Sequence, residues 1–112
     1  MKYKVCILVL ASALLGTSLF SYTVDFPTRA VVVYRVPGCT HFIAEGPNQF
    51  LIMEWRDGYD PVQGDILLGD FKNTGYADAY YPVPDVKGAV RVCAAYVSWG
   101  ETIIQYYKVC PY

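Results

Sequence analysis

The sequence predicts a mainly β protein with one C-terminal helix, built as a small SH3/OB-like barrel after a cleaved signal peptide. Three observations support this prediction. An uncharged apolar run follows a short basic start. Five or six short runs rich in β-branched and aromatic residues come next, separated by turn residues. The last segment combines a helix-capping pattern with apolar residues at helical spacing. With 112 residues, the chain forms one domain at most.

Residues 1–21 have the pattern of a secretory signal peptide. Lys2 and Lys4 supply the positive start, and residues 5–20 are uncharged and mostly Val, Ile, Leu and Ala. As a helix this run would reach about 24 Å, which is short of the roughly 30 Å hydrocarbon core that a permanent anchor must cross. The length therefore favours cleavage over the alternative, an uncleaved single-pass anchor.

We expect cleavage before Leu19 or before Tyr22, and we place the barrel domain at residues 22–112. The product is then periplasmic or secreted, with no attachment to the membrane. Loss of the two leader lysines leaves seven basic against ten acidic residues, a formal charge of −3. Because nucleic-acid binding requires a surplus of positive charge, we expect no nucleic-acid partner.

Six extended runs follow the leader, each bounded by turn residues. The first, residues 29–36, is rich in β-branched residues and ends at the strong turn pair Pro37-Gly38. Gly58 can supply a positive φ in the turn after the third run. The remaining runs lie at residues 42–44, 50–55, 66–68, 77–81 and 90–97. This pattern predicts the barrel of five or six short strands.

The C-terminal segment admits two interpretations. Residues 102–109 have the composition of a strand, since β-branched and aromatic residues outnumber helix formers. Ser98 and Glu101, however, match the S-x-x-E capping box that starts many helices. We predict a helix, because one apolar face would be formed at helical spacing by Trp99, Ile103, Tyr106, Tyr107 and Cys110.

Three cysteines remain once Cys6 leaves with the signal peptide, in a compartment that permits disulfides. We favour a bond between Cys93 and Cys110, which would tie the last element to the body and contribute about 3 kcal/mol. The alternative is that Cys39, in the turn after Pro37-Gly38, pairs with Cys110. Cys93 would then be an apolar residue buried in a strand.

The predicted binding surface is an aromatic and acidic loop edge. Exposed Tyr and Trp provide a large contact area at low cost in side-chain entropy, which suits recognition of a protein. Tyr76 and Tyr80 could instead fill the barrel interior. We predict an exported, non-enzymatic interaction module that binds an unidentified protein or envelope component through Trp55, Asp57, Tyr59, Asp60, Tyr76, Tyr80 and Tyr81.

Two other function classes remain open. Cys39 and His41 would share a face of an extended strand, as in a small thiol enzyme. Asp57 and Asp60 could offer oxygen ligands to calcium in a structural domain. We expect neither a cofactor nor a metal site, because no two cysteines have C-x-x-C spacing and His41 is the one histidine.

The second half of the chain contains a pattern of Trp, Gly-Asp and Gly residues. The pattern is formed by Glu54, Trp55, Gly58, Tyr59, Asp60, Pro61, Gly64, Asp65, Gly69, Asp70, Phe71, Gly75 and Asp78. In this pattern the chain resembles a group of small uncharacterised bacterial proteins, in which it recurs before a strand and a C-terminal helix. This resemblance implies the barrel-plus-helix architecture and no catalytic chemistry.

Overall fold

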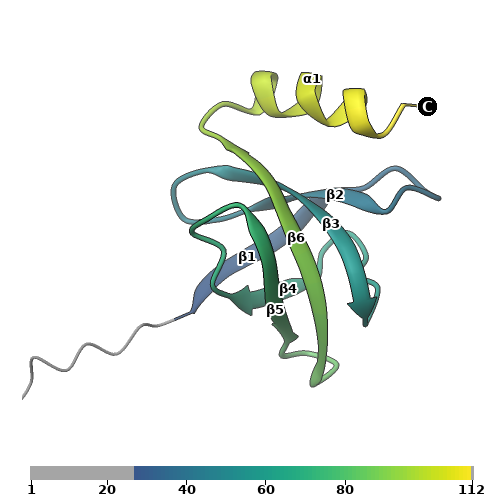
Figure 1. Ribbon diagram of the computed structural model, residues 1–112, viewed down its shortest axis with the longest axis vertical. Coiled ribbons are helices and arrows are strands. Elements are labelled where there is room, and N and C mark those ends of the chain that lie inside the picture. Colours follow the sequence, from purple (N-terminus) through teal and green to yellow (C-terminus); the bar gives the residue numbers. More distant parts are fainter. Residues whose placement is uncertain (1–26, 112) are drawn as a thin grey trace, which may run out of the picture.

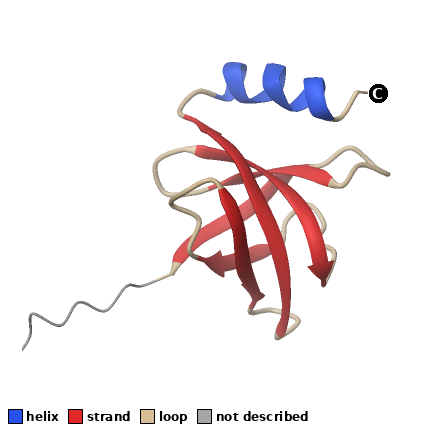
Figure 2. Ribbon diagram, in the orientation of Figure 1, coloured by secondary structure: helices blue, strands red, loops and turns tan. Residues whose placement is uncertain are grey.

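The computed structural model describes residues 27–111, so the predicted signal peptide and its cleavage sites lie outside the described residues. Six strands are followed by one helix, which confirms the mainly β fold with a C-terminal helix (Figures 1 and 2). The elements are β1 Thr28–Tyr34, β2 His41–Glu45, β3 Phe50–Gly58, β4 Ile66–Gly69, β5 Gly75–Tyr81, β6 Val86–Tyr96 and α1 Trp99–Val109. Within this part of the chain there is no helix with the length and apolarity needed to cross a bilayer.

The six strands form a closed antiparallel barrel in the order β1-β2-β3-β6-β5-β4. Two three-stranded meanders, β1 to β3 and β4 to β6, therefore meet at two seams. One seam pairs β3 with β6, and the other pairs β1 with β4 and closes the barrel. Closure leaves none of these six strands with an unpaired edge. Gly58 ends the first seam with the expected positive φ of 75°, and a Cβ there would lie 2.7 Å from the Cα of Gly88.

The barrel interior is filled by one side chain from every second strand position, as a period of two requires. On β2, Phe42 and Ala44 point inward, and on β5 Ala79 and Tyr81 do so. The interior cluster consists of Ala30, Val32, Phe42, Ala44, Leu51, Met53, Leu67, Phe71, Ala79, Tyr81, Val90 and Val92.

A second apolar layer lies between the barrel wall and α1, which crosses one side of the barrel in Figure 1. Ile43 of β2 and Ile52 of β3 are buried there against Tyr106 and Cys110. The middle of both strands is thus covered on its two faces. This explains why residues 42–44 and 50–53 read as continuous apolar runs rather than as alternating patterns.

The helix prediction is confirmed from Trp99 to Val109. Ser98 is the N-cap, and its Oγ accepts a hydrogen bond from the backbone N–H of Glu101 at 3.2 Å. The hydroxyl of Thr102 donates to the Ser98 carbonyl at 2.7 Å. The capping box is half used, because the Glu101 carboxylate accepts from the Gln105 side chain instead. The strand alternative is wrong because the cap and the apolar face both act at helical spacing.

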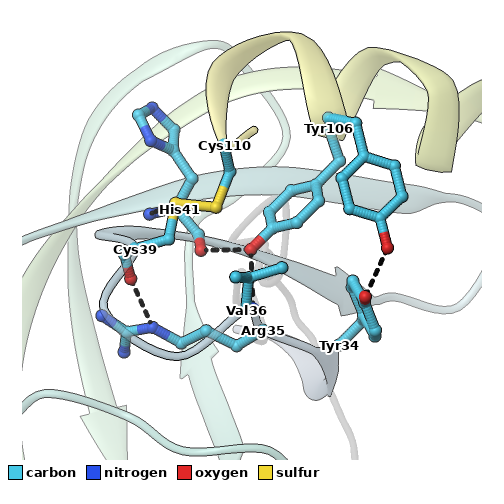
Figure 3. The surroundings of a disulfide bond; sticks show 8 residues. Tyr34, Arg35, Val36, Cys39, His41, Tyr106 and Cys110 are labelled. Carbon is cyan, nitrogen blue, oxygen red and sulfur yellow. Dashed lines mark hydrogen bonds between the residues drawn. A yellow bond between two sulfur atoms is a disulfide. The ribbon is translucent and has the colours of Figure 1, made fainter. Parts of the chain in front are cut away.

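The disulfide joins Cys39 to Cys110, with the Cα atoms 6.0 Å apart, and Cys93 is a free cysteine (Figure 3). The favoured pairing of Cys93 with Cys110 is therefore wrong, and the alternative pairing is the one observed. The reason is the path of α1. The helix starts at the end of β6 and packs across β3 and β2, so its last turn reaches the β1–β2 turn that carries Cys39.

The Tyr106 hydroxyl also fastens α1 to the β1–β2 turn. It accepts from the Val36 N–H at 3.0 Å and donates to the His41 carbonyl at 2.9 Å (Figure 3). The buried Tyr106 side chain thereby gives hydrogen-bond partners to two backbone groups. The hydroxyls of Tyr34 and Tyr107 form a further hydrogen bond between β1 and α1.

Replacing Cys39 and Cys110 together by alanine should lower the free energy of unfolding by roughly 4 kcal/mol, because the bond restricts an unfolded loop with a sequence separation of 71. Urea denaturation measures the loss. The control is Cys93→Ala, which removes a free thiol and leaves the cross-link in place. An equal loss in the two variants would contradict the assigned pairing.

Tyr106→Phe should cost about 1–3 kcal/mol of stability, because the Val36 N–H and the His41 carbonyl both lose their partner. Tyr76→Phe is the matched control, since 71% of Tyr76 is exposed. Thermal unfolding of the two variants beside the parent provides the comparison. An equal loss of stability in the two variants would mean that the Tyr106 hydrogen bonds between α1 and the turn do not stabilise the fold.

Candidate functional site

The structure divides the predicted binding edge between separate surfaces. Trp55 and Asp60 line a cleft of about 430 Å³ between the β1–β2 turn and the β3–β4 loop, which we call the loop cleft. Pro37 and Cys39 form its wall on the β1–β2 side, and Val62 lies on the opposite side. Of the seven predicted binding residues, these two line the loop cleft.

Arg35 holds the two walls of the loop cleft together. Its Nη1 donates to Asp60 Oδ1 at 2.6 Å and to the Pro61 carbonyl at 2.5 Å, while its Nε donates to the Cys39 carbonyl at 2.8 Å. The Arg35 side chain is only 15% exposed, whereas that of Asp60 is 54% exposed. The ion pair therefore presents its acidic member to solvent. The Trp55 indole N–H donates to the Gly58 carbonyl at 3.2 Å, which fixes the ring.

Asp57 and Tyr59 have local structural contacts instead. Asp57 Oδ1 accepts from the N–H of the next residue, Gly58, at 2.9 Å. The Tyr59 hydroxyl donates to Asp65 Oδ2 at 2.8 Å, and this hydrogen bond raises the pKa of Tyr59. Its ring packs against the barrel interior at 4.8 Å from that of Tyr81, centroid to centroid. Neither residue lines the loop cleft.

The calcium alternative gains no support from residues 27–111. The Asp57 carboxylate accepts from the Gly58 N–H and the Asp60 carboxylate pairs with Arg35. In this range, the two do not belong to any group of three closely spaced ligand atoms.

Tyr76 and Tyr80 lie on the outer face of β5, and both line a second cleft of about 560 Å³. Tyr76 is 71% exposed, with the Arg56 guanidinium 5.4 Å from its ring centroid. The Tyr80 hydroxyl donates to Asp85 Oδ1 at 2.6 Å, and this raises the pKa of Tyr80. The alternative in which these two rings fill the barrel is wrong, because the interior positions of β5 belong to Ala79 and Tyr81.

Tyr81 is fully buried, so its prediction as a surface binding residue is wrong. Strand alternation decides the matter, since Tyr80 and Tyr81 are adjacent and must face opposite sides. The Tyr81 hydroxyl finds no hydrogen-bond partner among the described residues. Burial raises the pKa of this tyrosine strongly.

Sequence analysis missed a cluster formed by His41, Glu54 and Cys93 on the outer wall of the barrel. One imidazole nitrogen, one carboxylate oxygen and the thiol sulfur all lie within 4.8 Å of one another. Each of the three residues is partly buried. They come from three neighbouring strands, β2, β3 and β6. We call this group the three-strand cluster.

Strand register explains how the three-strand cluster forms. His41 is the direct partner of Glu54 across β2 and β3. On β6, Ala94 pairs with Ile52 but Val92 pairs with Met53, so Cys93 is the extra residue of a β-bulge. Bulges redirect a side chain at one point of a ladder.

Electrostatics assign a protonation state to each member near neutral pH. Burial lowers the pKa of His41, which favours the neutral imidazole. A hydrogen bond from Arg91 Nε to Glu54 Oε1, 2.9 Å long, lowers the pKa of the Glu54 carboxyl. Burial raises the pKa of the Cys93 thiol. An activated nucleophilic cysteine needs a lowered pKa, so these shifts do not favour a thiolate nucleophile.

The thiol-enzyme alternative built on Cys39 and His41 loses its nucleophile, because Cys39 is bonded to Cys110. Figure 3 shows the His41 ring directed away from the Tyr106 hydroxyl that binds its carbonyl. One sequence signal could have paired two of the three members of the cluster. Extending the predicted strand 42–44 by one residue in the β2–β3 hairpin places His41 opposite Glu54.

No protein-family model matches the chain, and neither the curated proteins nor the solved structures yield a significant match. The resemblance carried by residues 54–78 therefore stays a prediction.

Tyr81 provides a direct test of core against binding surface. Tyr81→Phe should leave stability unchanged or raise it, because it removes a buried hydroxyl without a partner among the described residues. Tyr81→Ala should cost about 3–5 kcal/mol through loss of buried apolar volume. Chemical denaturation measures both. A loss of stability well below this range in the alanine variant would contradict the placement of Tyr81 in the core.

The raised pKa of Tyr81 predicts that the protein loses stability at alkaline pH. Because the folded-state pKa of Tyr81 lies above that of the unfolded chain, its contribution is complete below the unfolded value of about 10 and is lost as the pH rises above it. Tyr81→Phe should therefore show a smaller decline between neutral and strongly alkaline pH than the parent. Parallel declines in unfolding free energy would contradict the assignment.

Proposed function

We propose that this protein is exported and acts as a non-enzymatic interaction module, which binds a segment of another protein or envelope component in the loop cleft. The observation that carries the proposal is the convergence of Trp55, the exposed Asp60 carboxylate and one proline from each of two loops, which Arg35 links, around one cavity. Export is supported by the leader pattern of residues 1–21 and by the Cys39–Cys110 disulfide, which oxidising compartments preserve.

The chemistry of the loop cleft suits a peptide segment with apolar and basic side chains. A volume of about 430 Å³ lies within the usual range for binding pockets. Trp is enriched among the residues that dominate binding energy. Asp60 uses Oδ1 for Arg35, so its other oxygen remains available to a basic group of the partner.

Rigidity of the cleft walls also supports the proposal. Cys39 is held by the disulfide, its carbonyl by Arg35, and the Trp55 ring by the Gly58 carbonyl. Walls that are already ordered lose little conformational entropy when a partner binds. A cleft of this kind can bind a short segment without a large interface.

A photo-crosslinking residue at Val62 tests the proposal, since this residue lines the loop cleft and is 59% exposed. In the producing organism, illumination should give a discrete adduct of one partner. The second variant, Trp55→Ala in the same background, should reduce that adduct at least about tenfold, because one hot-spot side chain accounts for 2 kcal/mol or more.

The matched control places the same photo-crosslinking residue at Val83, which is 81% exposed and does not line the cleft. It should give none of the discrete adduct. An adduct that forms equally from both positions, or one that survives Trp55→Ala in a variant with unchanged melting temperature, would refute binding in the loop cleft.

A further inference from the structure

The three-strand cluster is distinct from the loop cleft and brings together the ligand types of a zinc site. Neutral imidazole, carboxylate and thiolate are the three groups that bind Zn²⁺ in proteins. His41, Glu54 and Cys93 offer one of each within 4.8 Å. His41 is the one histidine of the chain, and Cys93 is the one free cysteine of residues 27–111.

We propose that His41, Glu54 and Cys93 bind one Zn²⁺ ion on the outer wall of the barrel, with the fourth coordination position open to water or to an external ligand. Three protein ligands with one open position form the coordination that reactive zinc sites use, whereas structural sites have four protein ligands.

Spacing and charge both fit this ion. In a tetrahedral site, with metal–ligand bonds of about 2.0–2.3 Å, the ligand atoms lie roughly 3.3–3.8 Å apart. The observed atoms are within 4.8 Å of one another, so metal binding would draw them closer by about 1 Å. Binding releases the Cys93 proton to solvent, and the resulting thiolate and the Glu54 carboxylate supply two negative charges to the zinc, next to the Arg91 guanidinium. Sulfur and imidazole ligands disfavour calcium and magnesium.

Arg91 positions the carboxylate. Its Nε donates to Oε1 of Glu54 at 2.9 Å, and Arg56 Nη1 lies 3.5 Å from the same oxygen. Both contacts use Oε1, so Oε2 remains for the metal. Hydrogen bonds to the ligands orient them in most metal sites of proteins.

Solvent reaches the cluster on its His41 side. His41 lines a shallow cleft of about 360 Å³ next to the β1–β2 turn and the end of α1. The His41 carbonyl is fixed by Tyr106, so the strand that presents the imidazole is anchored.

The test uses the exported protein, purified without a polyhistidine tag, with its disulfide intact and stripped of metal by a chelator. Titration with Co²⁺ should give one equivalent of a complex with intense visible d–d bands and a thiolate-to-cobalt charge-transfer band in the near ultraviolet. Zn²⁺ should abolish both bands at one equivalent, raise the melting temperature and protect Cys93 from alkylation.

Three variants each remove one of the proposed zinc ligands. They are Cys93→Ser, His41→Gln and Glu54→Gln. Because loss of an outer partner already weakens metal binding 10–100-fold, removal of a direct ligand should weaken zinc binding at least about 100-fold. Asp57→Asn is the matched control, since Asp57 is an exposed carboxylate outside the cluster, and it should bind zinc as the parent does.

Two results would overturn the proposal. One is a cobalt complex of the parent protein without the charge-transfer band, a measurement that needs no variant to fold. The other is zinc affinity in the three ligand variants equal to that of Asp57→Asn. Neither result would bear on the loop cleft, because the crosslinking at Val62 requires no metal.

Discussion

The attachment of α1 to the β1–β2 turn is the constraint on which the rest of the molecule depends. The Cys39–Cys110 bond and the Tyr106 hydroxyl hold the last turn of the helix against residues 36–41. This attachment covers the outer faces of β2 and β3, where Ile43 and Ile52 would otherwise be exposed. A barrel of this size has a small interior, so a second apolar layer is a large part of its stability.

The loop cleft and the three-strand cluster each contain a residue of the anchored segment 36–41. Cys39 lines the loop cleft, and two residues later His41 belongs to the three-strand cluster. Arg35, next to this segment, also binds the β3–β4 loop through hydrogen bonds to Asp60 and to the Pro61 carbonyl. A segment fixed at several points holds side chains in place more accurately than a free loop can. The sites are therefore separate in chemistry but share their support.

Local sequence signals predicted the elements well and their contacts less well. The turn pair Pro37-Gly38 and the Ser98 cap depend on neighbouring residues, so the first strand and α1 could be predicted from the sequence. The disulfide depends on where α1 crosses the barrel, which no local pattern encodes. Tyr81 was misplaced for a related reason. A tyrosine side chain is suited both to a surface and to a core, and only the strand register decides between the two positions.

The two metal hypotheses show why spacing along the chain is a poor guide to sites in a sheet. Asp57 and Asp60 are close in sequence, yet each carboxylate is directed to a different partner. His41, Glu54 and Cys93 are far apart in sequence, yet register brings them together. Helical or loop sites leave motifs because their ligands share one element. A site spread over three strands leaves none, and here it also requires a bulge whose position depends on tertiary pairing.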